Sequence, residues 1–195
     1  MKTQRLIVGV SGASGIVYGI RALQILRELN IETHLVASKA AEMTLNYETD
    51  SSIAAFRGEA DHVYKMPDVG APIASGSFRT MGMLIAPCSV RTMSEIATGV
   101  TSSLLTRAAD VVLKERRPLV LMVRETPYHL GHIRTMEKLT EMGAIICPPL
   151  PAFYTNPKSM EDLIDQSVGR ALDLFGLDWQ ETRRWGEDLE KGRRS

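Results

Sequence analysis

The sequence predicts an α/β protein with a single domain of three layers, in which a parallel sheet is covered by helices on both faces. Short apolar stretches of strand length alternate with stretches whose apolar residues recur at helical spacing. The strand-like stretches are apolar almost throughout, which is typical of strands buried on both faces. The chain has 195 residues, of which 44% are hydrophobic and 24% charged. This length fits one sizeable core and is too short for two comfortable domains.

The first part of the chain is expected to hold three strands and two helices. Residues 6–10 are apolar and predict a strand, and residues 16–29 have apolar side chains at helical spacing. Residues 32–37 alternate between polar and apolar as a short strand does, and a helix over 39–49 follows. A short edge strand is expected over 62–65. Residues 67–80 are rich in Gly, Pro, Ser and Ala, which indicates a functional loop.

The second part continues the alternation of strands and helices. The expected strands cover 81–86, ending at Pro87, then 119–123 and 144–147. The expected helices cover 90–98, 102–114, 131–142 and 159–175, with Ser159 as the N-cap of the last. We expect the domain to span residues 1–177. Residues 178–195 form a C-terminal segment that packs over the active site or on a neighbouring subunit.

Composition argues against several classes of protein. Lys and Arg together number 23, as do Asp and Glu, so no bulk field attracts nucleic acid or an anionic membrane. The longest apolar runs are strand-sized, so no membrane span is expected, and a strand so near the N-terminus leaves no room for a signal peptide. Cys88 and Cys147 lack a metal or redox spacing, and the four histidines form no H-E-x-x-H-type pattern. We therefore expect a reduced, cytoplasmic protein without a metal site.

A glycine-rich turn follows the first expected strand. Gly9, Gly12 and Gly15 give the spacing G-x-x-G-x-x-G, whereas the dinucleotide-binding fingerprint is G-x-G-x-x-G. Such a turn offers backbone N–H groups and the positive end of a helix dipole, and Ser14 adds a hydroxyl. The turn therefore predicts an anionic ligand at the first strand end. The alternative is a structural turn without a ligand.

Two further strand ends carry small hydroxyl residues and a cation. Ser38, beside a lysine, suits a mononucleotide or another phosphate better than NAD, although a simple helix N-cap explains it equally well. Ser89 and Thr92 can donate to a phosphate or a ring carbonyl, and Arg91 can stack or pair. A capped helix start is the alternative, and the two interpretations are compatible. Cys88 invites a nucleophile hypothesis, which has no nearby base to support it.

Charged residues follow the strand over 119–123. Arg124 suits a phosphate and Glu125 suits proton transfer or orientation, unless the two form a structural ion pair. Tyr154 ends a proline-rich loop, and with Arg170 it makes a second candidate anion site. Arg107 and Lys114 are seven residues apart on one helical face, for which a solvated basic surface is the usual explanation. Two phosphate-compatible groups with one carboxylate between them predict two phosphorylated ligands.

Seven motifs in this order closely resemble the UbiX flavin prenyltransferases, formerly described as UbiX/Pad-type aromatic acid decarboxylases. The resemblance covers residues 2 to about 175. The motifs are VGVSGASG at 8–15, SGSF at 75–78, PCSVRT at 87–92, LTRAAD at 105–110, VLKERR at 112–117, RETP at 124–127 and PPLPAFY at 148–154.

The resemblance implies a Rossmann-like or flavodoxin-like, FMN-binding subunit of a homo-oligomer, usually a dodecamer. It implies metal-free transfer of a dimethylallyl group from dimethylallyl monophosphate to N5 and then C6 of reduced FMN. The prenylated FMN passes to a UbiD-type decarboxylase, in ubiquinone synthesis or in aromatic-acid breakdown.

The resemblance also implies roles for individual residues. Ser14, Lys114 and Glu125 look catalytic. The residues that look like FMN contacts are Gly12, Ala13, Ser14, Ser38, Ser89, Val90, Arg91, Thr92 and Arg124. Those that look like the prenyl-phosphate set are Arg107, Lys114, Tyr154 and Arg170, with Trp185 closing over the site.

Two other functions remain open. An FMN-dependent decarboxylase acting directly on an aromatic or cysteinyl carboxylate would share the fold. The cysteine-decarboxylating branch, however, has a histidine near its first helix, and residues 15–29 contain none. A flavin carrier without chemistry would explain the glycine turn but would leave Glu125, Tyr154 and the second cationic group without a role.

Overall fold

A computed structural model of the protein describes residues 4–187. Its six-stranded parallel sheet has the order β3-β2-β1-β4-β5-β6, so the expected three-layer α/β fold is confirmed. The chain order reverses between β1 and β4, as in a Rossmann sheet. The strands are β1 (Arg5–Val10), β2 (Glu32–Ala37), β3 (His62–Tyr64), β4 (Met83–Cys88), β5 (Leu119–Val123) and β6 (Ile145–Ile146).

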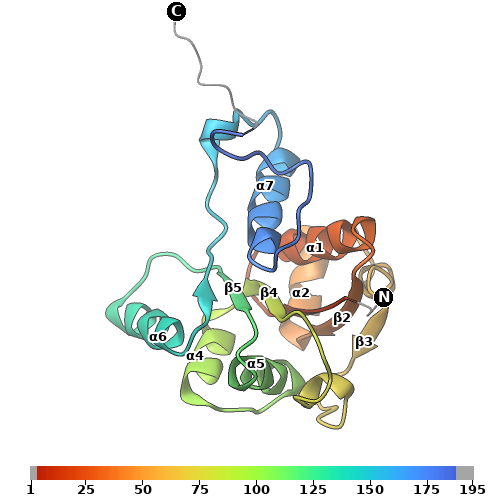
Figure 1. Cartoon of the computed structure of the whole chain (residues 1–195), viewed down its shortest axis with the longest axis vertical. Coiled ribbons are helices and arrows are strands. Elements are labelled where there is room, and N and C mark those ends of the chain that lie inside the picture. Colours follow the sequence, from red (N-terminus) through yellow and green to blue (C-terminus); the bar gives the residue numbers. More distant parts are fainter. Residues whose placement is uncertain (1–3, 188–195) are drawn as a thin grey trace, which may run out of the picture.

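Helices cover both faces of the sheet (Figure 1). One core cluster joins the sheet to the helices α1 (Ile16–Glu28), α2 (Lys39–Glu48) and α7 (Met160–Asp173). The other joins it to α4 (Val90–Thr98), α5 (Leu104–Lys114) and α6 (Leu130–Glu141). The structure also has a short helix α3 (Ile53–Arg57) and the 3₁₀ turns η1 (Pro72–Ala74) and η2 (Phe153–Thr155).

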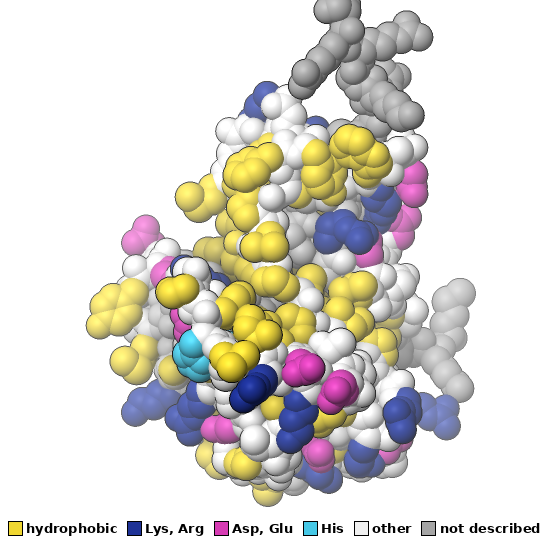
Figure 2. All heavy atoms as spheres, turned by 90° about the vertical axis from the view of Figure 1, so that its left-hand side faces the viewer, with side chains coloured by type: hydrophobic (Ala, Val, Ile, Leu, Met, Phe, Trp, Pro, Cys, Tyr) yellow, Lys and Arg dark blue, Asp and Glu magenta, His cyan; other side chains and the backbone are white. Residues whose placement is uncertain are grey.

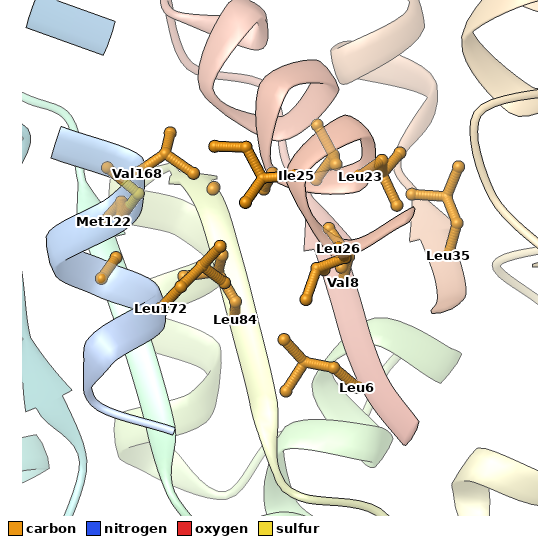
Figure 3. Packing of buried hydrophobic residues seen from close by; sticks show 14 of the residues in the cluster. Leu6, Val8, Leu23, Ile25, Leu26, Leu35, Leu84, Met122, Val168 and Leu172 are labelled. Atoms are coloured by element: carbon orange, nitrogen blue, oxygen red, sulfur yellow. The ribbon is translucent and has the colours of Figure 1, made fainter. Parts of the chain in front are cut away.

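Helices α1 and α7 lie side by side over the centre of the sheet. Leu26 of α1 and Leu172 of α7 are fully buried with Val8 and Leu84 of the strands below them (Figure 3). Each such side chain contributes about 1.5–3 kcal/mol through its removal from water. This packing fixes the beginning of α7 beside the end of β5, where the candidate site lies.

Strand β4 differs from the expected strand over 81–86. It begins after Gly82, whose φ is 145°, and it continues through Pro87 to Cys88. Proline lacks a donor, but its carbonyl accepts a hydrogen bond from the Ser11 amide (3.2 Å). The prediction that Pro87 ends the strand is therefore wrong, because β1 needs only an acceptor at that position.

Two other elements differ from expectation. Helix α3 is absent from the sequence prediction, although Ser52 caps it and Phe56 anchors it in the core. Strand β6 has two residues in place of the expected 144–147. The Cys147 amide still donates to the Leu121 carbonyl (2.8 Å), and two prolines that cannot donate follow it.

The chain beyond α7 folds back over α1 and α7. Leu177 and Trp179 are buried, and the Trp179 indole donates a hydrogen bond to Glu28 of α1 (2.9 Å). The Gln166 side-chain amide and the backbone of Arg183 exchange two hydrogen bonds. The expected boundary at residue 177 stays a prediction, and residues 188–195 of the expected C-terminal segment lie outside the described residues.

Two expectations concern the chain as a whole. Both cysteines are free, with Cys88 fully buried and Cys147 half-buried. Burial raises the pKa of the Cys88 thiol to about 12, which disfavours the nucleophilic thiolate. Within residues 4–187, no helix has the length and apolar character needed to cross a membrane.

Candidate active site

Ser11 joins the ends of β1 and β4 where the strand order reverses. Its hydroxyl donates to the Pro87 carbonyl (3.1 Å) and accepts from the Ser89 amide (2.7 Å). In a doubly wound sheet, ligands bind in the crevice at this point. The Ser11 hydroxyl is therefore committed to the scaffold, which leaves Ser14 as the hydroxyl of the turn that faces the crevice.

The glycines of the first turn have structural reasons for being glycine. A Cβ on Gly12 would lie 2.3 Å from the Ala40 Cβ, so the turn packs directly against α2. Gly15 has φ 100°, in the left-handed region, and precedes the first residue of α1. The spacing that indicated an anion site is thus also required by the packing of the turn.

Glu48, the last residue of α2, lies on the amino end of α1. Its carboxylate accepts from the Gly15 amide (3.1 and 2.8 Å) and from the Ile16 amide (3.0 Å). Sequence reasoning missed this residue, because a glutamate at the end of an expected helix gives no signal of a partner 33 residues away. Part of the expected anion cradle is thus filled by the protein's own carboxylate.

A cavity of about 520 Å³ opens beside this turn, at the carboxyl ends of the strands. It brings together three predicted site residues, Ser14, Arg124 and Glu125, with the missed Glu48. Its apolar wall is supplied by α1, by residues 148–151 and by one face of α7. Volume and lining are typical of a small-molecule site with a few polar groups in an apolar surround.

Tyr18, which sequence reasoning also missed, lines this cavity. Burial raises the pKa of its hydroxyl, and the positive charge of Arg124 opposes that rise. The tyrosine therefore stays protonated at neutral pH and offers a donor close to a cation. Its place three residues after Gly15, on the first turn of α1, is the pattern that could have revealed it.

Arg124 and Glu125 do not form the structural ion pair considered from the sequence. Within residues 4–187 no ion pair joins them. The Arg124 backbone amide donates to the Cys88 carbonyl (3.0 Å), and a Glu125 carboxylate oxygen accepts from the Thr126 amide (2.9 Å). These backbone contacts fix where both residues lie, and both line the cavity.

Ser38 and Ser89 cap the helices that follow β2 and β4, the two strands on either side of β1. Ser38 accepts from the Ala41 amide (3.1 Å), and Ser89 accepts from the Thr92 amide (3.3 Å). Arg91 pairs with Glu95 along α4 (2.9 Å) and is exposed. The helix-cap interpretation therefore describes these serines in the structure, and their proposed contacts with FMN stay predictions, as do those of Gly12, Ala13 and Val90.

Tyr154 and Trp185 contact each other, and among the described residues neither they nor Arg170 line the cavity. Their rings make an edge contact with centroids 5.6 Å apart, and both side chains are largely exposed. Arg170 forms an ion pair with Asp173 on the same helix. Burial raises the pKa of the Cys147 thiol, and the positive charge of Arg170 opposes that rise. The roles expected of these three residues stay predictions.

Arg107 and Lys114 lie apart from the cavity. They belong to α5, which packs in the other core cluster, on the sheet face opposite α1 and α7. Lys114 pairs with Glu115 near the start of β5, whereas the cavity lies at the strands' carboxyl ends. The single chain therefore does not join these two cations to Tyr154 and Arg170, because α5 runs from the carboxyl edge of the sheet back to its amino edge.

Comparison with known proteins identifies the family. The Flavoprotein family model matches residues 1–172. The chain is 55% identical to the flavin prenyltransferase UbiX of Thauera aromatica over 187 residues, 96% of each chain. It is 58% identical to the flavin prenyltransferase UbiX of Escherichia coli K12 over 175 residues, covering 89% of this chain and 93% of the other. The chain belongs to the UbiX flavin prenyltransferase family.

Solved UbiX structures share the fold. A crystal structure of AnUbiX (PadA1) in complex with FMN and dimethylallyl pyrophosphate has 52% identity and a TM-score of 0.93, covering 94% of this chain and 98% of the other. A dodecameric FMN-dependent Ubix-like decarboxylase from Escherichia coli O157:H7 has 46% identity and a TM-score of 0.91, covering 93% and 99%. The expected family, and with it a flavoprotein enzyme of the prenyltransferase class, is confirmed.

Proposed function

We propose that this protein transfers a dimethylallyl group from dimethylallyl monophosphate to N5 and C6 of reduced FMN. The carbon–oxygen bond to phosphate breaks, and bonds to N5 and C6 form as each of these ring atoms loses a proton. The prenyl double bond takes up one of the two protons, and the other leaves with the phosphate. The observation that carries this proposal is the cavity that brings Ser14, Arg124 and Glu125 together in a chain 52% identical to the FMN-containing AnUbiX.

The residues present fit a flavin mononucleotide. A cavity of about 520 Å³ with an apolar wall suits its ring system. Glu48 already occupies the amides of Gly15 and Ile16. We therefore place the flavin phosphate toward the amino ends of α2 and α4, which Ser38 and Ser89 cap and whose dipoles favour an anion. Arg124 supplies a cation on the side of the ring, and bound FMN supplies the electron-rich nitrogen.

Two carboxylates in this cavity can handle the proton. Glu125 is held by the Thr126 amide through one oxygen, which leaves the other free to orient the leaving phosphate or to accept the ring proton. Glu48, at the end of α2, lines the same cavity with its carboxylate on the amino end of α1. The apolar side chains of Val17, Leu163 and Ile164 line the same space and exclude water from an allylic cation.

A second copy of the chain supplies the remaining cations in this proposal. Arg107 and Lys114 lie on the far face of their own subunit, yet a metal-free transfer needs positive charge at the departing phosphate. Leu150, Phe153, Met160 and Trp185 are each more than two-thirds exposed near the rim of the site. Figure 2 shows hydrophobic side chains gathered in a band over this face. Such a patch is typical of an interface, so we propose a homo-oligomer, a dodecamer as in the Escherichia coli structure.

The route of the product is also a proposal. Prenylated FMN is of use only to an enzyme that takes it up, and we propose a UbiD-type decarboxylase as that enzyme. We propose a cytoplasmic location on the basis of two free cysteines without disulfide spacing. Fractionation of cells that express the tagged protein tests the location directly.

One anaerobic experiment separates the proposed function from its alternatives. The protein is incubated with reduced FMN and dimethylallyl monophosphate, in parallel with the pyrophosphate, and the released flavin is weighed by mass spectrometry. A mass gain of one prenyl unit supports the transferase. An unchanged flavin that stays bound indicates a carrier, and carbon dioxide released from an aromatic acid without a partner enzyme indicates a decarboxylase.

A further inference from the structure

A cluster of two histidines and a glutamate lies at the amino edge of the sheet, away from the cavity. Glu32 and His34 are two residues apart on β2 and therefore lie on the same face of the strand. His62 of β3 is the register partner of His34. Among residues 4–187 this is the one group of three His, Cys, Asp or Glu side chains whose donor atoms lie close enough to hold a metal ion. We propose that it binds one divalent zinc ion per chain.

The distances within the cluster fit a tetrahedral ion. Glu32 Oε1 lies 3.0 Å from His34 Nε2 and 3.4 Å from His62 Nε2. Two ligands at zinc bond lengths of about 2.0–2.1 Å lie about 3.3 Å apart on a tetrahedron. The two imidazole rings are stacked with centroids 4.7 Å apart. Closure on an ion therefore requires the His62 ring to turn, which its half-exposed position on an edge strand permits.

The surroundings of His34 resemble a metal ligand's outer partners. Its Nδ1 lies 2.9 Å from the Tyr64 hydroxyl, and the Phe78 ring packs edge-on against it at 5.1 Å. The Tyr64 hydroxyl can accept a hydrogen bond from Nδ1–H, and in that tautomer Nε2 carries the lone pair that a metal needs. Two imidazoles and a carboxylate form a ligand set that zinc commonly takes.

Arg5 sets the strength of the site. Its Nε donates to Glu32 Oε1 (2.9 Å), and its guanidinium lies 5.0 Å from the centre of the Phe78 ring. A fixed cation on the same carboxylate competes with a metal ion. Removal of the Arg5 charge should therefore tighten zinc binding, whereas removal of a ligand should weaken it. Opposite effects of these two kinds of substitution on zinc affinity distinguish a metal site from a hydrogen-bonded cluster.

Zinc bound here would join β2 to the edge strand β3 and to the loop that contains Phe78. Arg117 holds that loop from the other side by donating to the carbonyls of Gly76 and Phe78 (both 2.8 Å). The role is structural and independent of the proposed prenyl transfer, because the cavity lies at the opposite edge of the sheet. Bound zinc should raise the unfolding temperature of the full chain.

The test is a zinc titration of the full-length, chelator-treated protein in competition with a chromophoric chelator. We expect one ion per chain, affinity at least tenfold weaker in Glu32→Gln and His62→Asn, and tighter binding in Arg5→Gln. His132→Asn is the matched control, because His129 and His132 form the other stacked pair, with centroids 3.6 Å apart. Any of three results would overturn the proposal: the same zinc affinity in all variants, a loss of zinc affinity only in His132→Asn, or the absence of stoichiometric zinc binding by the parent protein. Circular dichroism verifies that each variant is folded.

Discussion

The carboxylate of Glu48 lies 2.8 Å from the backbone nitrogen of Gly15, at the amino end of a helix in another part of the chain. The first amides of a helix have no partner within it, and the helix dipole favours a negative charge there. Glu48 satisfies two of these amides from the end of α2. The glycine turn is thus shaped by a protein anion before any ligand arrives.

Two substitutions of Glu48 should separate its hydrogen bonds to the amides of α1 from the effect of its negative charge on that helix end. Glu48→Ala removes both and should lower the free energy of unfolding by about 1 kcal/mol, as loss of a helix cap does. Glu48→Gln keeps an acceptor for the Gly15 amide and should lose about half as much. Urea unfolding measures both. Glu141→Ala, which truncates the side chain at the last residue of α6, is the matched control, and a loss of equal size there would contradict the anchoring role.

Glu125→Gln should leave FMN bound while it slows transfer. The amide keeps the shape of the side chain but can no longer accept a proton, which typically lowers a rate by about 10²–10⁴-fold. Flavin absorbance gives FMN retention, and mass spectrometry gives the yield of prenylated flavin. Glu137→Gln on exposed α6 serves as control. A normal yield from Glu125→Gln would rule out the proton or orienting role.

Tyr154→Phe should weaken use of the prenyl phosphate and spare FMN. Loss of one hydrogen bond to a charged phosphate costs about 1.5–3 kcal/mol, which raises the KM for dimethylallyl monophosphate by about tenfold or more. Arg170→Ala should act in the same direction. Tyr47→Phe is the control, since Tyr47 is 87% exposed on α2. Loss of FMN from the Tyr154 variant would show that Tyr154 belongs to the FMN site rather than to the prenyl-phosphate site.

Mixed oligomers should reveal sites shared between copies. Lys114→Ala and Glu125→Gln should each be inactive alone. Co-refolded in equal amounts, they should recover activity at about a quarter of the sites, where one neighbour gives Lys114 and the other Glu125. The measurement is prenylated flavin per chain. If the mixture stays as inactive as its components, each site draws both residues from one chain.

Stability at low pH should depend on Asp61. Backbone and side-chain hydrogen bonds from Thr33 (2.8 and 2.9 Å) hold the pKa of this carboxyl below its ordinary 3.8, despite some burial that raises it. A lowered folded-state pKa stabilises the fold above the ordinary value, and this contribution is lost as pH falls through the folded value. Asp61→Asn should lower the free energy of unfolding at pH 7 by only about 1 kcal/mol, because solvent screens the exposed carboxylate. The difference in this free energy between the variant and the parent protein should shrink below pH 3.8. Urea unfolding at both pH values, with Asp50→Asn as control, measures it; a pH-independent difference would contradict this account.

Part of the site could be predicted from the sequence, because ligands of parallel sheets bind at the carboxyl ends of the strands. Ser14, Arg124 and Glu125 follow buried strands, and a parallel sheet brings those ends to one edge. Glu48 and the Glu32, His34 and His62 cluster escaped this prediction, since their partners are joined by strand register and helix packing rather than by spacing.

The position of Lys114 also could not be predicted. The seven-residue spacing of Arg107 and Lys114 predicts that they share one face of a helix. It does not predict which side of the sheet that helix covers. That choice depends on how α5 packs against Ile85 and Leu121, which only the assembled fold shows.

Helix α2 is capped at its start by Ser38, which lies beside the end of β1, and it ends with Glu48 at the start of α1, so both of its ends serve the same edge of the sheet. One inserted residue would turn Glu48 by about 100° around the helix axis and carry it away from Gly15. The length of α2 is therefore a fixed spacer between two helix ends, and a one-residue insertion or deletion there should be far more harmful than any single exposed substitution along it.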